Sequence, residues 1–280
     1  MVCVDFSRPP GTRQSYWSSN TFFAAGGLAS CELVLGGNVR RTWRWVVLVI
    51  LAVVIAAAIW FLIPLGPLDG AEDSLRSGEN VLVDDDPWLT FTPIDETTTG
   101  LILYPGARVD PVSYAPAARA IAEEGFLTVV VPMPLNLAVL SPNRAEEVIA
   151  AHPEIETWAI GGHSLGGAMA SQFANTHRTV IQGVVLWAAY PGVNTSLRNG
   201  NQAVQVVYGT GDCISTPEEV LATKSRLPED TELVAIPGGN HMQFGWYEGQ
   251  MGSCPPSISL QDQQAMTVAA AVEFLHDLDS

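Results

Sequence analysis

Six short apolar runs recur after residue 98, and each is separated from the next by a segment of helical character. The runs are GLILY (100–104), FLTVVV (126–131), TWAIG (157–161), GVVLWA (183–188), AVQVVYG (203–209) and ELVAIP (232–237). Continuous β-branched runs of this kind indicate strands that are buried on both faces, as in a parallel sheet covered by helices. We therefore expect residues 99–280 to form an α/β domain with a mainly parallel sheet and helices on both faces.

The segments between these runs carry signals for the start of helices. Ser141 is followed by Pro142, and Thr216 is followed by Pro217 and two glutamates. In each case a capping side chain precedes a proline at the first helical position. We expect helices to begin at both places. Residues 66–98 contain two further strand candidates, NVLVDD and WLTFTP, and we interpret this region as a linker with edge strands.

No charged residue occurs between Arg44 and Asp69, and valine, isoleucine, leucine and alanine dominate this run. About 20 helical residues cross the hydrocarbon layer of a bilayer, and tryptophans near both ends suit its interfaces. We predict a transmembrane helix at residues 45–65, preceded by a cytoplasmic tail without regular structure at residues 1–44. A cleaved signal peptide is the alternative, although the run is longer than the apolar core of most signal peptides.

Charge predicts the orientation and limits the partners of the chain. Three arginines precede the apolar run and three acidic residues follow it, so the positive-inside rule leaves the N-terminus in the cytoplasm. We expect a single-pass protein of the cell membrane with an extracytoplasmic domain, or a secreted protein if the segment is cleaved. The net charge is −16, and all but two of the 29 acidic residues follow residue 65. Such a domain repels phosphates, so we expect no nucleic-acid partner.

Ser164 stands in the stretch IGGHSLGGAMA (160–170), directly after a strand-like run and before a helix-like segment. A strand that turns sharply into a helix holds the residue at the turn in a strained conformation, so the residues two places away must be small. Gly162 and Gly166 occupy those places. We predict that the turn exposes the Ser164 hydroxyl as a nucleophile above a helix N-terminus.

A nucleophilic serine needs a base, and the base needs an acid to orient it. In α/β domains with this turn the order along the chain is serine, acid and histidine, each after a strand. Asp212 follows the run 203–209, and His241 follows the run 232–237 in a glycine-rich loop. We therefore predict a catalytic triad of Ser164, Asp212 and His241 at one edge of the sheet.

Acyl transfer also requires donors for the oxyanion, usually the N–H after the nucleophile and a second from an earlier loop. Leu165 supplies the first donor. The loop LYPGARVDP (103–111) supplies the second from Gly106 or Ala107. Lids of such domains are commonly inserted at the position of residues 189–202, and this connection is too short for a large lid.

Three stretches resemble the compact bacterial α/β-hydrolase family that is grouped near dienelactone hydrolases and carboxylesterases. They are residues 104–145, GGHSLGGAMA (161–170) and GGNHMQFGWY (238–247), and the similarity extends from about Leu101 to the C-terminus. The resemblance implies an α/β-hydrolase fold with Ser164, Asp212 and His241 as the triad. Dienelactone hydrolases proper use a cysteine nucleophile, so lactone chemistry is not implied.

These features predict a membrane-anchored serine hydrolase that cleaves an ester or thioester through an acyl-enzyme. A small acyl compound is the expected substrate, and the mechanism needs no metal and no cofactor. The alternative is a catalytically silent binding module of the same fold, tethered to the membrane. Labelling by a fluorophosphonate separates the two.

Four cysteines are present, and the apolar run divides them into two pairs. Cys3 and Cys31 precede the run, whereas Cys213 and Cys254 follow it. A bond between Cys213 and Cys254 would tie together the loops that carry the proposed acid and base. Export would allow such a bond, because disulfides persist outside the cytoplasm. Two unrelated buried thiols are the alternative.

Overall fold

The structure is a computed structural model that describes residues 37–279 of the 280-residue chain. Its described residues divide into two units, one before and one after the junction of Ala52 and Val53. Helix α1 (Gly37–Leu62) begins before the expected residue 45 and ends before residue 65. It ends there because Ile63 precedes Pro64, and a residue before proline avoids the helical conformation. Most of the expected tail, residues 1–36, lies outside the described residues.

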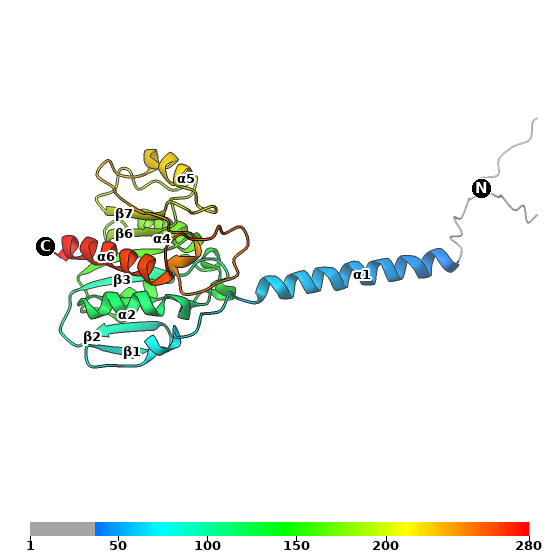
Figure 1. The fold of residues 1–280 in the computed structure, drawn as a ribbon, viewed down its shortest axis with the longest axis horizontal. Helices are drawn as coiled ribbons and strands as arrows, with labels where there is room; N and C mark the ends of the chain where they lie inside the picture. Colours follow the sequence, from blue (N-terminus) through cyan, green and yellow to red (C-terminus); the bar gives the residue numbers. More distant parts are fainter. Residues whose placement is uncertain (1–36, 280) are drawn as a thin grey trace, which may run out of the picture. The chain divides into compact units, whose positions relative to one another are not determined.

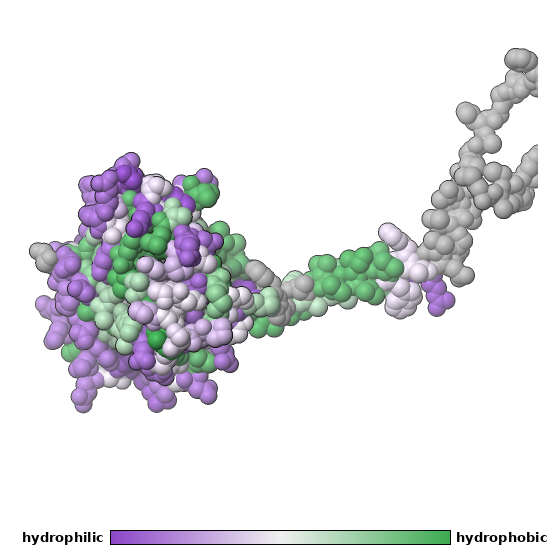
Figure 2. Space-filling view, turned by 45° about the horizontal axis from the view of Figure 1, so that its top comes forward, coloured by the Kyte–Doolittle hydropathy of each residue, from purple (hydrophilic) through white to green (hydrophobic). Residues whose placement is uncertain are grey.

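The side chains described along α1 are largely apolar and exposed, and most of them are green, for hydrophobic, in Figure 2. Among the residues that the structure describes, no helix combines the length and the apolarity that a bilayer span requires.

A single sheet of eight strands forms the centre of the second unit (Figure 1). The strands are β1 (Val81–Asp84), β2 (Leu89–Pro93), β3 (Thr99–Tyr104), β4 (Leu127–Val130), β5 (Thr157–His163), β6 (Ile181–Trp187), β7 (Ala203–Gly209) and β8 (Glu232–Ile236). Their spatial order is β1-β2-β4-β3-β5-β6-β7-β8. Strand β2 pairs antiparallel with both β1 and β4, and the remaining neighbours, in the order β4-β3-β5-β6-β7-β8, pair in parallel. The prediction of a mainly parallel sheet is confirmed.

Helices cover both faces of this sheet, as expected. Helices α2 (Ala115–Glu123) and α6 (Leu260–Asp279), green and red in Figure 1, pack side by side on one face. Helices α3 (Ala145–Ala151), α4 (Leu165–Thr176) and α5 (Pro217–Ala222) contribute to the apolar core of the other face. The connection 188–202 between β6 and β7 contains neither helix nor strand, so no lid domain is inserted there.

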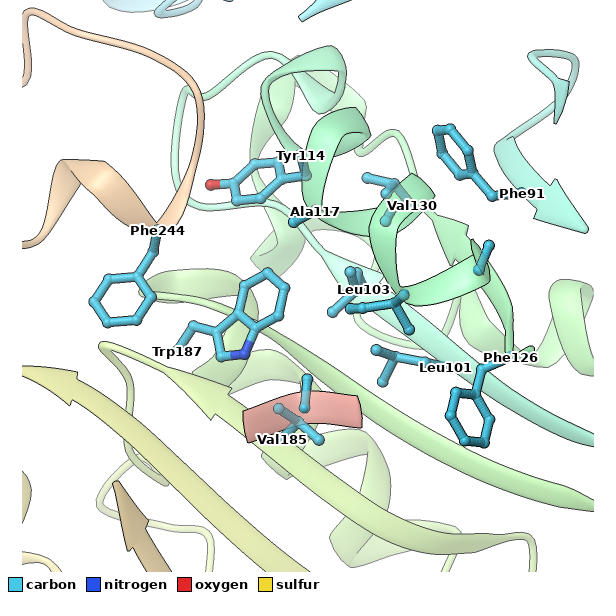
Figure 3. Close-up of a cluster of buried hydrophobic side chains, with 14 of the residues drawn as sticks. Phe91, Leu101, Leu103, Tyr114, Ala117, Phe126, Val130, Val185, Trp187 and Phe244 are labelled. Carbon is cyan, nitrogen blue, oxygen red and sulfur yellow. The ribbon is translucent and has the colours of Figure 1, made fainter. Parts of the chain in front are cut away.

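Side chains along β3 alternate between two apolar cores. Leu101 and Leu103 belong to the core beneath α2 and α6, whereas Ile102 and Tyr104 belong to the core beneath α4. Successive side chains of a strand point to opposite faces, so a strand in this position must be apolar throughout. The first core reaches the carboxyl edge of the sheet, where Figure 3 shows aromatic side chains gathered close together. These are Tyr114, Trp187 and Phe244.

The two predicted helix starts have different outcomes. The hydroxyl of Thr216 accepts a hydrogen bond from the Glu219 N–H at 3.2 Å, and the Glu219 carboxylate accepts one from the Thr216 N–H at 3.1 Å. This reciprocal capping box confirms the predicted helix start at Thr216. The start at Ser141 is wrong, because residues 141–144 form turns and α3 begins only at Ala145. The Arg144 N–H bonds to the Ser141 carbonyl at 3.3 Å, which closes a turn before the helix.

Candidate active site

The turn at Ser164 joins β5 directly to α4. Ser164 has φ 53° and ψ −121°, a conformation that residues other than glycine rarely adopt. Its N–H donates to the Trp187 carbonyl on the adjacent β6 at 3.0 Å, which fixes the turn to the sheet. A backbone conformation of this kind costs on the order of 1–3 kcal/mol, and such strain is concentrated at functional sites.

Gly162 and Gly166 allow the turn to pack against the end of β3. A β-carbon at Gly162 would lie 2.5 Å from the Tyr104 carbonyl oxygen. A β-carbon at Gly166 would overlap the carbonyl oxygens of Tyr104 and Pro105. These neighbours are backbone atoms, which cannot rotate away as a side chain would. The absence of side chains therefore brings the loop that follows β3 directly against the turn at Ser164.

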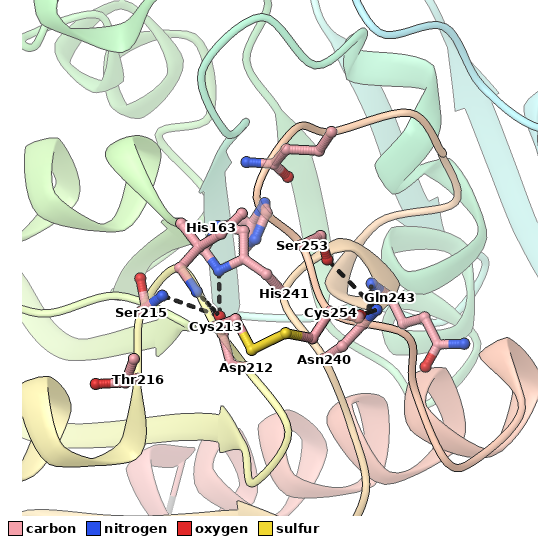
Figure 4. A network of polar contacts seen from close by, with 12 residues as sticks. His163, Asp212, Cys213, Ser215, Thr216, Asn240, His241, Gln243, Ser253 and Cys254 are labelled. Carbon is pink, nitrogen blue, oxygen red and sulfur yellow. Dashed lines mark hydrogen bonds and ion pairs between the residues drawn. A yellow bond between two sulfur atoms is a disulfide. The ribbon is translucent and has the colours of Figure 1, made fainter.

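Asp212 and His241 come together at the carboxyl ends of neighbouring strands, β7 and β8. His241 Nδ1 lies 2.8 Å from Asp212 Oδ2, and both side chains are buried (Figure 4). The second oxygen, Asp212 Oδ1, accepts hydrogen bonds from the N–H groups of Ile214 at 2.7 Å and Ser215 at 2.9 Å. The carboxylate is thus held from both sides, and it fixes the plane of the imidazole.

The protonation of His241 follows from this contact. A carboxylate only accepts hydrogen bonds, so Nδ1 carries the proton that it donates to Asp212. In the neutral ring Nε2 then keeps a lone pair and is the basic atom. Nε2 has no hydrogen-bond partner within the described part of the chain, so the predicted contact with the Ser164 hydroxyl is not made here. Such contacts are often completed only when substrate is bound.

The structure narrows the choice of oxyanion donors. The Leu165 N–H is at the first position of α4, where a helix provides no partner for it. The Gly106 N–H donates to the Tyr114 hydroxyl at 2.9 Å, so it is not free to bind an oxyanion, contrary to expectation. Ala107, the other candidate, is the next residue of the same loop and becomes the second donor that we consider.

Two buried residues that the sequence did not single out connect this loop to the turn at Ser164. The Tyr114 hydroxyl accepts from Gly106 and lies 2.8 Å from His163 Nδ1. The Tyr114 hydroxyl and His163 Nδ1 therefore share one hydrogen bond, whose direction depends on the tautomer of His163. The His163 ring lies 4.6 Å from the His241 ring, centre to centre. No local pattern predicts this contact, because residues 49 positions apart make it.

Further contacts hold the loop that carries His241. The Gln263 side chain on α6 accepts from the Asn240 N–H at 2.9 Å and donates to the Asn240 carbonyl at 2.8 Å. The Asn240 side chain donates to the Cys254 carbonyl at 2.7 Å. Cys254 forms the expected disulfide with Cys213, the residue after the candidate acid (Figure 4). The disulfide therefore cross-links the loop that carries Asp212 to the loop that carries His241.

Loss of the disulfide is expected to lower the stability of the chain. The two cysteines are 41 residues apart, and closing a loop of this length is worth about 4 kcal/mol in the chain-entropy model. A Cys213→Ser, Cys254→Ser double variant should lose up to that amount in free energy of unfolding, measured by urea titration. A reductant should destabilise the parent and leave the double variant unchanged. Equal stability of parent and variant would contradict the cross-link.

The burial of the His163 ring is expected to make the free energy of unfolding depend on pH. Burial, and secondly the neighbouring His241, hold the pKa of His163 well below its usual range. The unfolded chain therefore binds a proton at this ring below pH ~6.5, whereas the folded chain does not. Protonation of His163 therefore does not affect the free energy of unfolding above pH ~6.5. Below that pH the proton bound by the unfolded chain lowers the free energy of unfolding by up to about 1.4 kcal/mol for each pH unit.

A His163→Phe variant is the control, because phenylalanine cannot bind a proton. Its free energy of unfolding should fall less steeply between pH 6.5 and 5 than that of the parent. The comparison of slopes is independent of any overall loss of stability in the variant. Identical slopes would show that His163 is protonated in the folded chain.

Three solved structures with a similar backbone are distant from this chain in sequence. A CIB-like hydrolase from Thermoplasma acidophilum matches with a TM-score of 0.53 and 13% identity, over 72% of this chain and 100% of that chain. Est1E from Butyrivibrio proteoclasticus matches with a TM-score of 0.51 and 13% identity, over 72% and 99%. Esterase 2 from Thermogutta terrifontis matches with a TM-score of 0.50 and 17% identity, over 72% and 95%. At such identities the likeness establishes a shared fold.

Sequence comparison assigns the family. No curated protein matches the chain. A family model described as the alpha/beta hydrolase family matches residues 100–265, which is more than half of the chain. The resemblance stated from the three sequence motifs is thereby confirmed. The chain belongs to the α/β-hydrolase family.

Proposed function

We propose that this chain is a serine hydrolase that cleaves ester or thioester bonds through an acyl-enzyme. The observation that carries the proposal is the buried Asp212–His241 pair at the same sheet edge as Ser164, a serine held at a strained turn. This combination provides an oriented base and a nucleophile above the start of a helix. The names of two structural neighbours, Est1E and esterase 2, support the choice of an ester.

In the proposed mechanism the Ser164 Oγ attacks the acyl carbon, and His241 Nε2 takes the hydroxyl proton. The C–O or C–S bond of the substrate then breaks, and Nε2 delivers the proton to the leaving group. Water repeats these steps on the acyl-enzyme and releases the acid. Asp212 holds the ring in the required tautomer and stabilises its positive charge.

The negative oxygen of each tetrahedral intermediate needs donors that are already in position. The N–H groups of Leu165 and Ala107 fill this role in the proposal. The Tyr114 hydroxyl supports it indirectly, since it holds the preceding Gly106 N–H and connects the loop to His163. Removing one such donor in comparable enzymes costs about 2.7–4 kcal/mol of transition-state stabilisation.

Substitution of the nucleophile tests the proposal. Ser164→Ala should lower the turnover of p-nitrophenyl acetate by several orders of magnitude, as loss of a triad nucleophile does. The β-carbon is kept, so the backbone strain at this position is unchanged and folding is preserved. Ser225→Ala, at an exposed serine, is the matched control and should retain parental turnover.

Two outcomes would contradict the assignment. Parental turnover in Ser164→Ala would exclude this serine as the nucleophile. A parent chain that is folded but neither hydrolyses esters nor reacts with a fluorophosphonate would favour the silent binding module instead.

The proposal includes a membrane anchor with the hydrolase domain outside the cytoplasm. It rests on the charge-free run between Arg44 and Asp69 and on the arginines before it. The Cys213–Cys254 disulfide is compatible with export, because disulfides are rare in the cytoplasm.

Cell fractionation tests the anchor. The chain should remain in the membrane pellet after a carbonate wash at high pH, and replacement of Val53 and Val54 by lysine should release part of it. A parent chain found in the soluble fraction would contradict the anchor. The N-terminal peptide of such a soluble chain, identified by mass spectrometry, would show whether a signal peptide had been removed.

A further inference from the structure

Residues 63–68, which we call the strap, pair with the loop that carries Ala107. The Leu65 N–H donates to the Arg108 carbonyl at 2.5 Å, and the Leu65 carbonyl accepts from the Asp110 N–H at 2.9 Å. These two bonds form a parallel bridge between Leu65 and Val109. The strap is therefore attached to the candidate oxyanion loop along its backbone.

The other end of the strap pairs with the segment after His241. The Leu68 N–H donates to the Trp246 carbonyl at 2.8 Å, and Pro67 forms an antiparallel bridge with Tyr247. The strap thus joins two of the loops that build the candidate active site. It lies before residue 100, where the match to the family model begins, so it is an addition to the matched family region.

A cavity of about 370 Å³ opens between the strap, the Ala107 loop and residues 249–251. This volume is within the range of small-molecule sites. Most of its lining side chains are apolar, and two of them, Ile63 and Met251, are exposed with fractional exposures of 58% and 76%. The lining includes Ile63, Pro64, Leu65, Ala107, Gln250 and Met251.

Polar groups at the cavity are largely occupied by the protein itself. Arg108 also lines it, but its Nη2 donates to the Ile63 carbonyl at 3.0 Å. The Gln250 side chain accepts from the Tyr247 hydroxyl at 2.5 Å. An apolar ligand suits such a lining better than one that needs several hydrogen bonds.

We propose that this cavity binds the aliphatic acyl chain of the substrate, so that the strap selects esters with chains longer than acetyl. The inference rests on the proposed function. Ala107 lines the cavity. If the Ala107 N–H holds the oxygen of the acyl carbonyl, the acyl chain therefore begins beside the strap. Ile63, Leu65 and Met251 would then cover that chain.

The test is the turnover of p-nitrophenyl acetate, butyrate, hexanoate and octanoate by the full-length chain, below the concentrations at which the esters aggregate. Each methylene that enters the cavity should raise kcat/KM by up to about fourfold, the equivalent of about 0.8 kcal/mol, until the cavity is filled. Met251→Gln and Ile63→Gln should each lower the ratio of the octanoate kcat/KM to the acetate kcat/KM below the parental ratio. Both side chains are exposed, so the variants should fold.

Met266→Gln is the matched control, because Met266 is an exposed methionine of α6 that does not line the cavity. It should keep the parental dependence on chain length. A parent that hydrolyses acetate but shows no rise with chain length overturns the cavity inference alone. If the rise with acyl-chain length is the same in both Gln variants as in the parent, the acyl chain binds elsewhere, and the cavity inference is again overturned. A parent that hydrolyses no ester overturns the proposed function and this inference together.

Discussion

The packing of the Ser164 turn against the end of β3 is the constraint on which the candidate site depends. The turn needs a positive φ at Ser164, and the backbone of Tyr104 leaves no room for a side chain at Gly162 or Gly166. Because the contact is between backbone atoms, Ser164 and the Ala107 loop are placed by the same packing. A shift in either would move the other, so the proposed mechanism couples attack by Ser164 to stabilisation of the oxyanion.

Hydrogen bonds between distant segments complete this arrangement. The Tyr114 hydroxyl accepts from the Gly106 N–H and forms a hydrogen bond with His163 Nδ1, which ties the loop after β3 to the residue before the candidate nucleophile. On the other side Asp212 orients His241, and the disulfide joins the loops that carry them. The electrostatic groups of the site are thus held in place before any substrate arrives, which is the condition for stabilising charge in a transition state.

The sequence predicts the strands and the helix cap that depend on a local residue pattern. It does not predict features that depend on contacts between separate segments of the chain. The buried strands follow from continuous β-branched runs, and the Thr216 cap follows from its spacing to Glu219. Ser141 has the same local signal, but its segment closes a turn and α3 begins four residues later. The sequence does not distinguish Gly106 from Ala107 as an oxyanion donor, because no sequence pattern indicates that the Gly106 N–H donates to the Tyr114 hydroxyl. The sequence pattern divides the strap between the predicted transmembrane span (45–65) and the linker (66–98), because the residues that pair with it, Val109 and Tyr247, are distant in the sequence.

The most direct measurement is the mass of the chain after reaction with a fluorophosphonate, followed by peptide mapping. We expect one phosphonyl group for each chain, carried by Ser164 and absent from the Ser164→Ala variant. This reaction requires the activated nucleophile and no knowledge of the substrate. An adduct on another residue, or a folded chain that hydrolyses esters without forming an adduct, would contradict the assignment of Ser164 as the nucleophile.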